Sequence, residues 1–332
     1  MNIIIDAMGG DNAPGEIIRG ACDASLRLSS DLTLVGQRDV IEKHLSEHDK
    51  DMSRISIFHA DDVLSMEDDP ISVVRTKKGS SMAEGFRLLN ESGDAFISAG
   101  NTGALHTGAT LIVKNIKGVR RAAISTVLPF ERPALMMDCG ANVNVTPDNF
   151  LQWAILGSVY MRDVTGVKKP EVGLLNIGTE ESKGTDIHRE AYRILSESAD
   201  ISFVGNVEAK QIPFGACDIL LADGFTGNVV LKLIEGMASF MFGELKKMFT
   251  HSAVTKLSYL AMKDQLRGMK RSFDAAEYGG APILGISKPV IKAHGSSDAR
   301  AIFNAVRQAE LFCTAGVIGK VEDAVERMRQ GT

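Results

Sequence analysis

The chain alternates short, uniformly apolar runs with longer segments of helical periodicity, and this alternation limits its fold more than any other feature. Eight runs have the length and uniform hydrophobicity of buried strands: Asn2 to Asp6, Leu32 to Val35, Ile55 to His59, Ala95 to Ser98, Ala134 to Asp138, Val172 to Ile177, Ile201 to Val204 and Ile219 to Ala222. Helical patterns lie between most of them: Pro14 to Leu28, Gln37 to His48, Ser81 to Ser92, Thr102 to Asn115, Pro147 to Asp163 and Thr185 to Ser198. Such alternation predicts one large α/β unit over residues 1–332, with helices on both faces of a mostly parallel sheet.

Two stretches depart from this rhythm. The strand-like runs Ala122 to Leu128 and Ala134 to Cys139 are joined by a short link with a proline at each end, so they predict an antiparallel pair or a bend instead of a helical crossover. From about Gly227 to Asp274 the sequence is helical and nearly free of proline, with an interruption near His251. This tract predicts two helices in tandem, which project from the body as a hairpin over residues 240–275.

Composition excludes several classes of function. The 332 residues carry a formal net charge of −5 and a sequence pI near 5.9, so no overall positive field attracts nucleic acid. The four cysteines form no C-x-x-C pair and are expected to be buried thiols of a reducing compartment: Cys22, Cys139, Cys217 and Cys313. The first residues lack a signal-peptide pattern, and no apolar run reaches the length of a membrane span. A cytoplasmic protein is therefore expected.

Small and polar turn residues follow the predicted strands and recur near the C-terminus. They occupy seven places: 6–11, 98–103, 138–142, 176–180, 205–206, 223–228 and 294–298. In an open α/β sheet, turns of this kind meet at the carboxyl edge, where ligands bind. Glycine allows a ligand to approach the backbone, while Ser, Thr and Asn cap the next helix and leave N–H groups facing an anion. Each turn alone is also explained as ordinary chain reversal, but seven together predict one phosphate-binding edge.

Several familiar catalytic motifs are absent from the sequence. It contains no Walker-type phosphate loop, no G-x-G-x-x-G fingerprint, no G-x-S-x-G elbow and no H-E-x-x-H pair, so no nucleotide, metal or other cofactor is expected. An enzyme of this composition would act by positioning and electrostatics. Cys139 is the one candidate nucleophile, because it ends a strand, although a buried thiol without a nearby histidine is more often structural.

Six segments together resemble the phosphate acyltransferase family, the acyl-acyl carrier protein:phosphate transacylases. They are DAMGGD (6–11), SAGNTGA (98–104), GLLNIGTEESKG (173–184), DGFTGNVVLK (223–232), EYGGAPILG (277–285) and AHGSSDA (293–299). The resemblance implies transfer of a fatty acyl group from acyl carrier protein to inorganic phosphate, giving acyl phosphate for phospholipid synthesis. It also implies a Rossmann-like fold related to phosphotransacetylases and isocitrate-type dehydrogenases. A homodimer at the inner face of the cell membrane, which supplies a membrane glycerol-3-phosphate acyltransferase, is the expected setting.

Three residues are predicted to be catalytic. By resemblance, Lys183 supplies positive charge to phosphate or to the oxyanion, and Asn228 donates a hydrogen bond to one of them. His294 is a candidate proton donor to the leaving thiolate. A solvated lysine, a helix N-cap and a hydrogen-bonded core histidine are the respective structural alternatives.

Phosphate or acyl-phosphate contacts are expected from the turns and from one arginine between two prolines, which a surface role would also explain. The set comprises Gly9, Gly10, Asp11, Gly100, Asn101, Thr102, Arg132, Asn142, Gly178, Asn206, Gly224, Thr226, Gly227, Gly295 and Ser296.

The predicted hairpin is basic within an acidic chain. From Lys246 to Arg271 the basic residues are Lys246, Lys247, Lys256, Lys263, Arg267, Lys270 and Arg271, against one acid, Asp264. Val254, Leu257, Leu260 and Ala261 share one helical face. An amphipathic contact with a membrane or an acidic carrier protein is one interpretation; a dimer or core interface with solvated lysines is the other.

Two further classes of function remain open from the sequence. An isocitrate-like dehydrogenase would use the turn carboxylates Asp6, Asp11, Asp138 and Asp223 for a divalent metal beside NAD(P). A non-catalytic membrane scaffold would explain the basic hairpin but would leave the glycine turns without a purpose.

Overall fold

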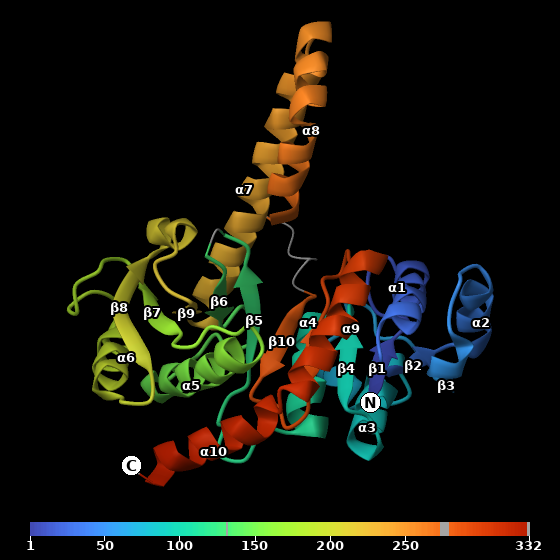
Figure 1. The fold of residues 1–332 in the computed structure, drawn as a ribbon. Helices are drawn as coiled ribbons and strands as arrows, with labels where there is room; N and C mark the ends of the chain where they lie inside the picture. Colours follow the sequence, from blue (N-terminus) through green and yellow to red (C-terminus); the bar gives the residue numbers. More distant parts are fainter. Residues whose placement is uncertain (131, 273–278, 331–332) are drawn as a thin grey trace.

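A single eleven-stranded sheet organises the protein (Figure 1). A computed structural model of the chain describes residues 1–130, 132–272 and 279–330. In sheet order the strands are β3 (Ile55–His59), β2 (Asp31–Gly36), β1 (Asn2–Asp6), β4 (Ala95–Ser98), β11 (Val290–Lys292), β10 (Ala281–Leu284), β5 (Ala123–Leu128), β6 (Ala134–Met137), β9 (Ile219–Leu221), β7 (Glu171–Asn176) and β8 (Ser202–Glu208).

The direction of the strands reverses in the middle of this sheet. The first half, β3–β2–β1–β4–β11, is parallel, and so is the second half, β6–β9–β7–β8. Between them, β10 is antiparallel to β11 and β5, and β5 is antiparallel to β6. The expected antiparallel pair is confirmed. The prediction that all the turns meet at one carboxyl edge is wrong, because three antiparallel pairings place the carboxyl ends of the two halves at opposite edges.

Helices cover both faces of the sheet, as the alternation predicts. The α-helices are α1 (Gly15–Arg27), α2 (Arg38–Ser46), α3 (Ser81–Glu91), α4 (Thr102–Gly108), α5 (Pro147–Asp163), α6 (Asp186–Glu197), α7 (Gly224–Thr250), α8 (Ala253–Ser272), α9 (Ala299–Thr314) and α10 (Val317–Gln330). Shorter turns are η1 (Met52–Arg54), η2 (Pro70–Val73), η3 (Ala109–Val113) and η4 (Ala209–Phe214).

Three apolar clusters form the core. In β1, Ile3 and Ile5 pack with α1, α2 and α9, while Ile4 on the opposite face packs with Phe86 of α3 and with α4. The α4-side cluster continues into the second half, where the first turns of α7 join it. The third cluster packs α5 and α10, with Trp153 at its centre, on the other face of the second half. Strands buried on both faces explain why the sequence runs are uniformly apolar.

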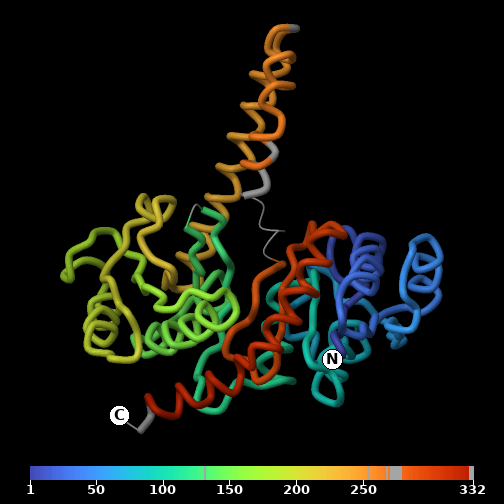
Figure 2. The backbone as a smooth tube through the Cα atoms, in the orientation of Figure 1, coloured from blue at the N-terminus to red at the C-terminus, as the bar shows by residue number. Residues whose placement is uncertain are grey.

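The helices α7 and α8 project from the body as a hairpin (Figure 2). α7 begins three residues earlier than the predicted tract, at Gly224, and the break falls between Thr250 and Ala253 as expected. The predicted end of the tract, residues 273–275, lies outside the described residues.

Several sequence expectations are corrected. Gly205 and Asn206 do not form a turn after a strand but lie inside β8, where the register with β7 shifts. The helix predicted over Thr102 to Asn115 becomes a π-helical segment at Ala109. The sequence analysis missed β10 and β11, which have four and three residues, and also missed α9 and α10. Strands so short carry almost no periodic signal.

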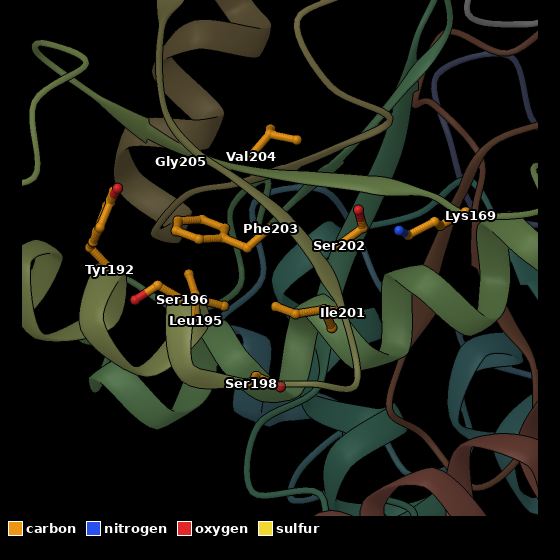
Figure 3. A pocket seen from close by; sticks show the side chains of 10 residues that line it. All are labelled: Lys169, Tyr192, Leu195, Ser196, Ser198, Ile201, Ser202, Phe203, Val204 and Gly205. Carbon is orange, nitrogen blue, oxygen red and sulfur yellow. The ribbon is translucent and has the colours of Figure 1, made fainter.

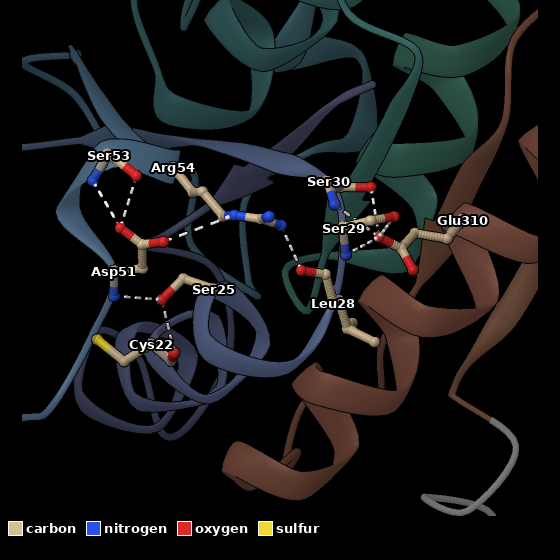
Figure 4. Close-up of polar contacts among 9 residues, drawn as sticks. All are labelled: Cys22, Ser25, Leu28, Ser29, Ser30, Asp51, Ser53, Arg54 and Glu310. Carbon is tan, nitrogen blue, oxygen red and sulfur yellow. Dashed lines mark hydrogen bonds and ion pairs between the residues drawn. The ribbon is translucent and has the colours of Figure 1, made fainter.

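One carboxylate ties α9 to the turn that precedes β2 (Figure 4). Glu310 Oε1 accepts hydrogen bonds from the backbone N–H and hydroxyl groups of both Ser29 and Ser30. Arg54 donates to the Leu28 carbonyl at 2.5 Å and pairs with Asp51, so the same turn is held from the other side.

We expect Glu310→Ala to lower the free energy of unfolding by about 1–3 kcal/mol, because it leaves the N–H and hydroxyl groups of the turn without their acceptor. Denaturant unfolding followed by circular dichroism measures the change. Glu322→Ala, at an exposed glutamate of α10, is the control. Equal stability of the two variants would contradict the role given to Glu310.

Candidate active site

The turns after β1, β4 and β11 form one cluster at the edge of the first half. Asp11 N–H donates to the Gly295 carbonyl at 2.8 Å, and the Asn12 amide donates to the Ser296 carbonyl at 3.0 Å. Gly10 has a φ of +113°, and a Cβ there would lie 2.9 Å from Ala99 Cβ, so a side chain at Gly10 is excluded by both conformation and space. We call this group, residues 6–12, 98–102 and 292–298, the first turn cluster.

A lysine that the sequence analysis did not single out lies buried in the first turn cluster. Lys292 is only 7% exposed, and its Nζ donates hydrogen bonds to the carbonyl oxygens of Ala99 and Ala293. Burial lowers the pKa of Lys292 to about 8, and the nearby Asp11 partly opposes that shift. The available sequence signal was one charged residue inside the apolar run Val290 to Ala293.

The turns after β6 and β9 form a second turn cluster, residues 138–142 and 223–228, at the opposite edge. Asp138 is buried, and its carboxylate accepts five N–H bonds, from Ile124, Gly140, Ala141 and twice from Asn142. A Cβ on Gly227 would lie 1.9 Å from the Asp138 carbonyl oxygen, so only glycine lets α7 begin here. Asn228 then lies beside Gly140: a Cβ added to Gly140 would be 3.7 Å from the Cβ of Asn228.

Lys183 lies in the loop after β7, at the same edge as the second turn cluster. A Cβ on Gly178 would lie 2.9 Å from Lys183 Cγ, so the glycine makes room for the lysine stem. Asn176 donates to the Lys183 carbonyl at 3.2 Å and to Asn206 at 3.1 Å. The side chain of Lys183 is 45% exposed, and its Nζ is 4.0 Å from Glu180 Oε1.

The first turns of α7 connect the two edges. Glu235 interacts electrostatically with Cys139 of the second turn cluster and with His294 of the first. Lys232 interacts electrostatically with both Lys292 and His294. Asn228 and Glu235 are two helical turns apart, a rise of about 10 Å. The first turns of α7 therefore run from the second turn cluster toward the first.

Several predicted contact residues use their polar atoms to hold the turns. Asn101 caps α4 and donates to the carbonyls of Met66 and Asp68; Asn142 donates to Ala122 and Asp138; Asn206 donates to the Glu180 carbonyl; Thr226 donates to Asp223. The N–H groups of Gly100, Gly224 and Gly227 bond to Ser98, Asn142 and Asp223. These groups are occupied within the protein.

The structure does not bring Arg132 to either turn cluster. It precedes β6, and its guanidinium bonds to Asp218, Glu171 and the Gly215 carbonyl. The side-chain hydrogen bonds to Asp218 and Glu171 raise the pKa of Arg132, and the two carboxylates neutralise its charge.

The remaining predicted residues are accessible or lie at glycine turns. Lys183, Asn228, Thr102, Asp11, His294 and Ser296 are exposed, whereas Gly9, Gly10, Gly178 and Gly295 are buried or half-buried. Within the described part of the chain, the side chains of Asn228 and Thr102 have no hydrogen-bond partner. His294 Nδ1 accepts from the Ser296 N–H at 3.3 Å and lies 2.9 Å from the Ser296 hydroxyl. Partial desolvation of the ring lowers the pKa of His294, so the neutral form with its proton on Nε2 is favoured.

Cys139 has the properties of a structural thiol. It is 6% exposed and its Sγ donates to the Met136 carbonyl. Burial, with a smaller contribution from Asp138, raises the pKa of Cys139 well above its ordinary value. A neutral, enclosed thiol is a poor nucleophile.

The four carboxylates considered as metal ligands divide between the two turn clusters, with Asp6 and Asp11 in one and Asp138 and Asp223 in the other. Burial raises the pKa of Asp6, which accepts a hydrogen bond from Ser98. Among the residues that the structure describes, no three His, Cys, Asp or Glu side chains are grouped to hold a metal.

A separate hollow lies along the outer strand β8 (Figure 3). Its lining comes from α6 and β8 and includes Tyr192, Phe203 and Val204. None of the three residues predicted to be catalytic lines it, so we do not assign it to the reaction.

Solved structures share this fold at low sequence identity. A phosphotransacetylase from Streptococcus pyogenes aligns with a TM-score of 0.60 at 17% identity, covering 98% of this chain and 94% of that chain. A 4-hydroxythreonine-4-phosphate dehydrogenase from Klebsiella pneumoniae aligns with a TM-score of 0.52 at 14% identity, covering 94% and 99%. The architecture is therefore that of the phosphotransacetylase-like α/β proteins, a fold that also includes dehydrogenases and does not by itself decide the chemistry.

The sequence relatives identify the chemistry. A family model described as fatty acid synthesis protein matches residues 1–320. A phosphate acyltransferase from Geobacillus thermodenitrificans is 45% identical over 331 residues, covering 98% of this chain and 99% of that protein, and one from Acetivibrio thermocellus is 43% identical, covering 99% and 97%. The chain belongs to the phosphate acyltransferase family and is an enzyme that transfers an acyl group to phosphate.

We expect Cys139→Ala to keep kcat for acyl phosphate formation within about threefold of the unchanged enzyme, because a buried, protonated thiol takes no part in bond formation. Initial rates and iodoacetamide labelling of the folded protein measure this. A loss of activity of a thousandfold, with the thiol reacting rapidly in the unchanged enzyme, would instead make Cys139 a nucleophile.

Proposed function

We propose that the enzyme transfers a fatty acyl group from acyl carrier protein to inorganic phosphate, and that the acyl phosphate enters phospholipid synthesis. The observation that carries this proposal is the pair Lys183 and Asn228, a cation and an amide donor. Both are exposed side chains at the edge where β6, β9 and β7 end. The neighbouring asparagines bond within the protein, whereas Asn228 has no side-chain partner among the described residues. Lys183 has one long, exposed ion pair, with Glu180 at 4.0 Å, which a bound anion can replace.

The proposed step is a direct attack of phosphate on the thioester. An oxygen of HPO₄²⁻ forms a bond to the carbonyl carbon, the C–S bond breaks, and the proton carried by phosphate ends on the departing sulfur. Charge develops on the carbonyl oxygen, where the Asn228 amide and the Lys183 ammonium stabilise it. Phosphate is already a nucleophile, so alignment of the two substrates supplies the remaining rate acceleration.

His294 is assigned a narrower role than proton donor. Its lowered pKa and the acceptor role of Nδ1 leave a neutral imidazole with an N–H at Nε2. That group donates a hydrogen bond to phosphate or to the leaving sulfur. The thiolate is a stable leaving group near neutral pH and needs no strong acid.

We expect Lys183→Ala and Asn228→Ala each to lower kcat by about 10²–10³, the usual effect of removing one oxyanion donor. Acyl phosphate formation from acyl-acyl carrier protein, without nucleotide and in the presence of a chelator, is the assay. Lys43→Ala, at an exposed lysine of α2, is the control.

Full activity of both variants would remove these residues from the mechanism. If the unchanged enzyme forms no acyl phosphate from acyl-acyl carrier protein, that thioester is not the acyl donor. Another thioester would then supply the acyl group.

We further propose that the hairpin docks on an anionic partner, with the membrane surface as its main site. Val254, Leu257 and Leu260 are 73%, 69% and 62% exposed, so this stripe is not part of the core. Lys246, Lys247, Lys256 and Lys263 lie on the same two helices; the side chains of Arg267, Lys270 and Arg271 lie outside the described residues. In the described residues, no helix is both long and apolar enough to cross a bilayer.

This arrangement supports a peripheral position on the inner face of the cell membrane. There, a homodimeric cytoplasmic enzyme would receive acyl carrier protein and pass its acyl phosphate to a membrane glycerol-3-phosphate acyltransferase. An apolar stripe together with basic side chains is the combination that binds anionic bilayers.

We expect the double variant Leu257→Glu, Leu260→Glu to lose flotation with vesicles that contain anionic lipid, because two charges replace the apolar contact. The double variant Leu26→Glu, Leu311→Glu, at exposed leucines of α1 and α9, should float like the unchanged protein. Unchanged flotation of the hairpin variant, with altered oligomeric state in sedimentation, would instead assign the stripe to the homodimer.

A further inference from the structure

The first turn cluster holds a buried cation that has no ion-pair partner. Lys292 Nζ bonds to the carbonyl oxygens of Ala99 and Ala293, and no carboxylate of the described residues lies within 4.0 Å of it. An ammonium has three donors, so the third has no acceptor in the described structure. An unpaired charge at such a site is costly to the folded protein, and a compensating ligand is the usual reason to keep it.

Charged groups around Lys292 come from three directions. Asp6 is on β1, Asp11 follows it in the next turn, and Lys232 is on α7. His294, two residues along the chain, also interacts electrostatically with Lys292. Lys232 is paired with Glu235 at 2.7 Å, so its charge is already compensated, whereas Lys292 has no carboxylate partner among the described residues. Glycine turns at residues 9–10, 100 and 295 keep side chains out of the way. A buried ammonium with an unused donor at such a backbone-lined site favours a small oxyanion.

We infer that Lys292 is a binding residue for the phosphate nucleophile, which it holds in the first turn cluster opposite the Lys183 and Asn228 edge. The inference rests on the proposed function, since it assigns the nucleophile to one half of the molecule and the thioester carbonyl to the other.

A purely structural role for Lys292 makes different predictions, and β11 supplies a matched control. Lys288, two residues before β11, donates from Nζ to the carbonyls of Leu89 and Gly93 at 2.6 and 3.0 Å. Both lysines cap two backbone carbonyls, but Lys288 lies away from the turns. If capping were the whole role of Lys292, the two methionine variants would behave alike.

The test is direct titration of the full-length enzyme with inorganic phosphate, by calorimetry and by thermal shift, without acyl donor. We expect Lys292→Met to raise the phosphate Kd at least about tenfold, the loss of one charge-assisted contact. Its melting temperature without phosphate should be unchanged or higher, because an unpaired buried charge has been removed. Lys288→Met should melt at a lower temperature and bind phosphate normally. In steady state, Lys292→Met should raise KM for phosphate and leave KM for the acyl donor within twofold.

A phosphate Kd for Lys292→Met within twofold of the unchanged enzyme would overturn the inference. If that variant fails to fold, the unchanged enzyme still decides the question. Above pH 8 phosphate remains a dianion, so a fall in its affinity there reports loss of charge on a protein group whose pKa is about 8. Constant affinity from pH 8 to 9.5 would refute the role. Phosphate binding without acyl transfer from acyl carrier protein would contradict the proposed donor and leave Lys292 in place.

Discussion

The packing of the first turn of α7 against the carbonyl of Asp138 is the contact on which the candidate site depends. A Cβ on Gly227 would lie 1.9 Å from that oxygen and one on Gly224 would lie 2.7 Å from the Asn142 nitrogen, so the helix can start there only with glycine at both positions. The start point fixes where the rest of α7 runs. Asn228 consequently lies beside Gly140, while Lys232 and Glu235, one and two turns further on, act on the opposite edge of the sheet.

This position of α7 compensates for the reversal in the sheet. Parallel halves that point in opposite directions would keep their carboxyl ends apart, and turns at opposite edges cannot share one small ligand directly. α7 begins at the second turn cluster, and two helical turns later it passes near the first turn cluster, so one rigid helix connects the two. The glycines of the second turn cluster therefore serve helix packing, which is a different reason for glycine from the open phosphate cradle that the sequence suggests.

Much of the architecture could be predicted because burial on both faces makes strands uniformly apolar, and β1 and β7 are examples. The reversal could not, since it depends on β10 and β11, which together have seven residues and no periodicity. For the candidate site, the motifs single out Lys183 and Asn228, whose side chains are exposed. They could not separate these from Asn101, Asn142 and Asn206, because an amide that holds a turn and one that meets a ligand are the same residue in sequence. Lys292 was missed because a single lysine in an apolar run looks like an ordinary strand end.

The division of charge between the two edges bears on how the reaction is organised. Acyl transfer needs the attacking oxygen about 3–3.5 Å from the carbonyl carbon, whereas Asn228 and Glu235 are separated by about 10 Å of helix. In the proposed arrangement, phosphate approaches from one side and the thioester from the other, so that the reacting atoms meet between the two turn clusters. With phosphate on the buried Lys292 and the carbonyl on Asn228 and Lys183, each half of the sheet contributes one substrate. In this proposed arrangement α7 would set the distance between the two substrates, and catalytic alignment would depend on helix packing.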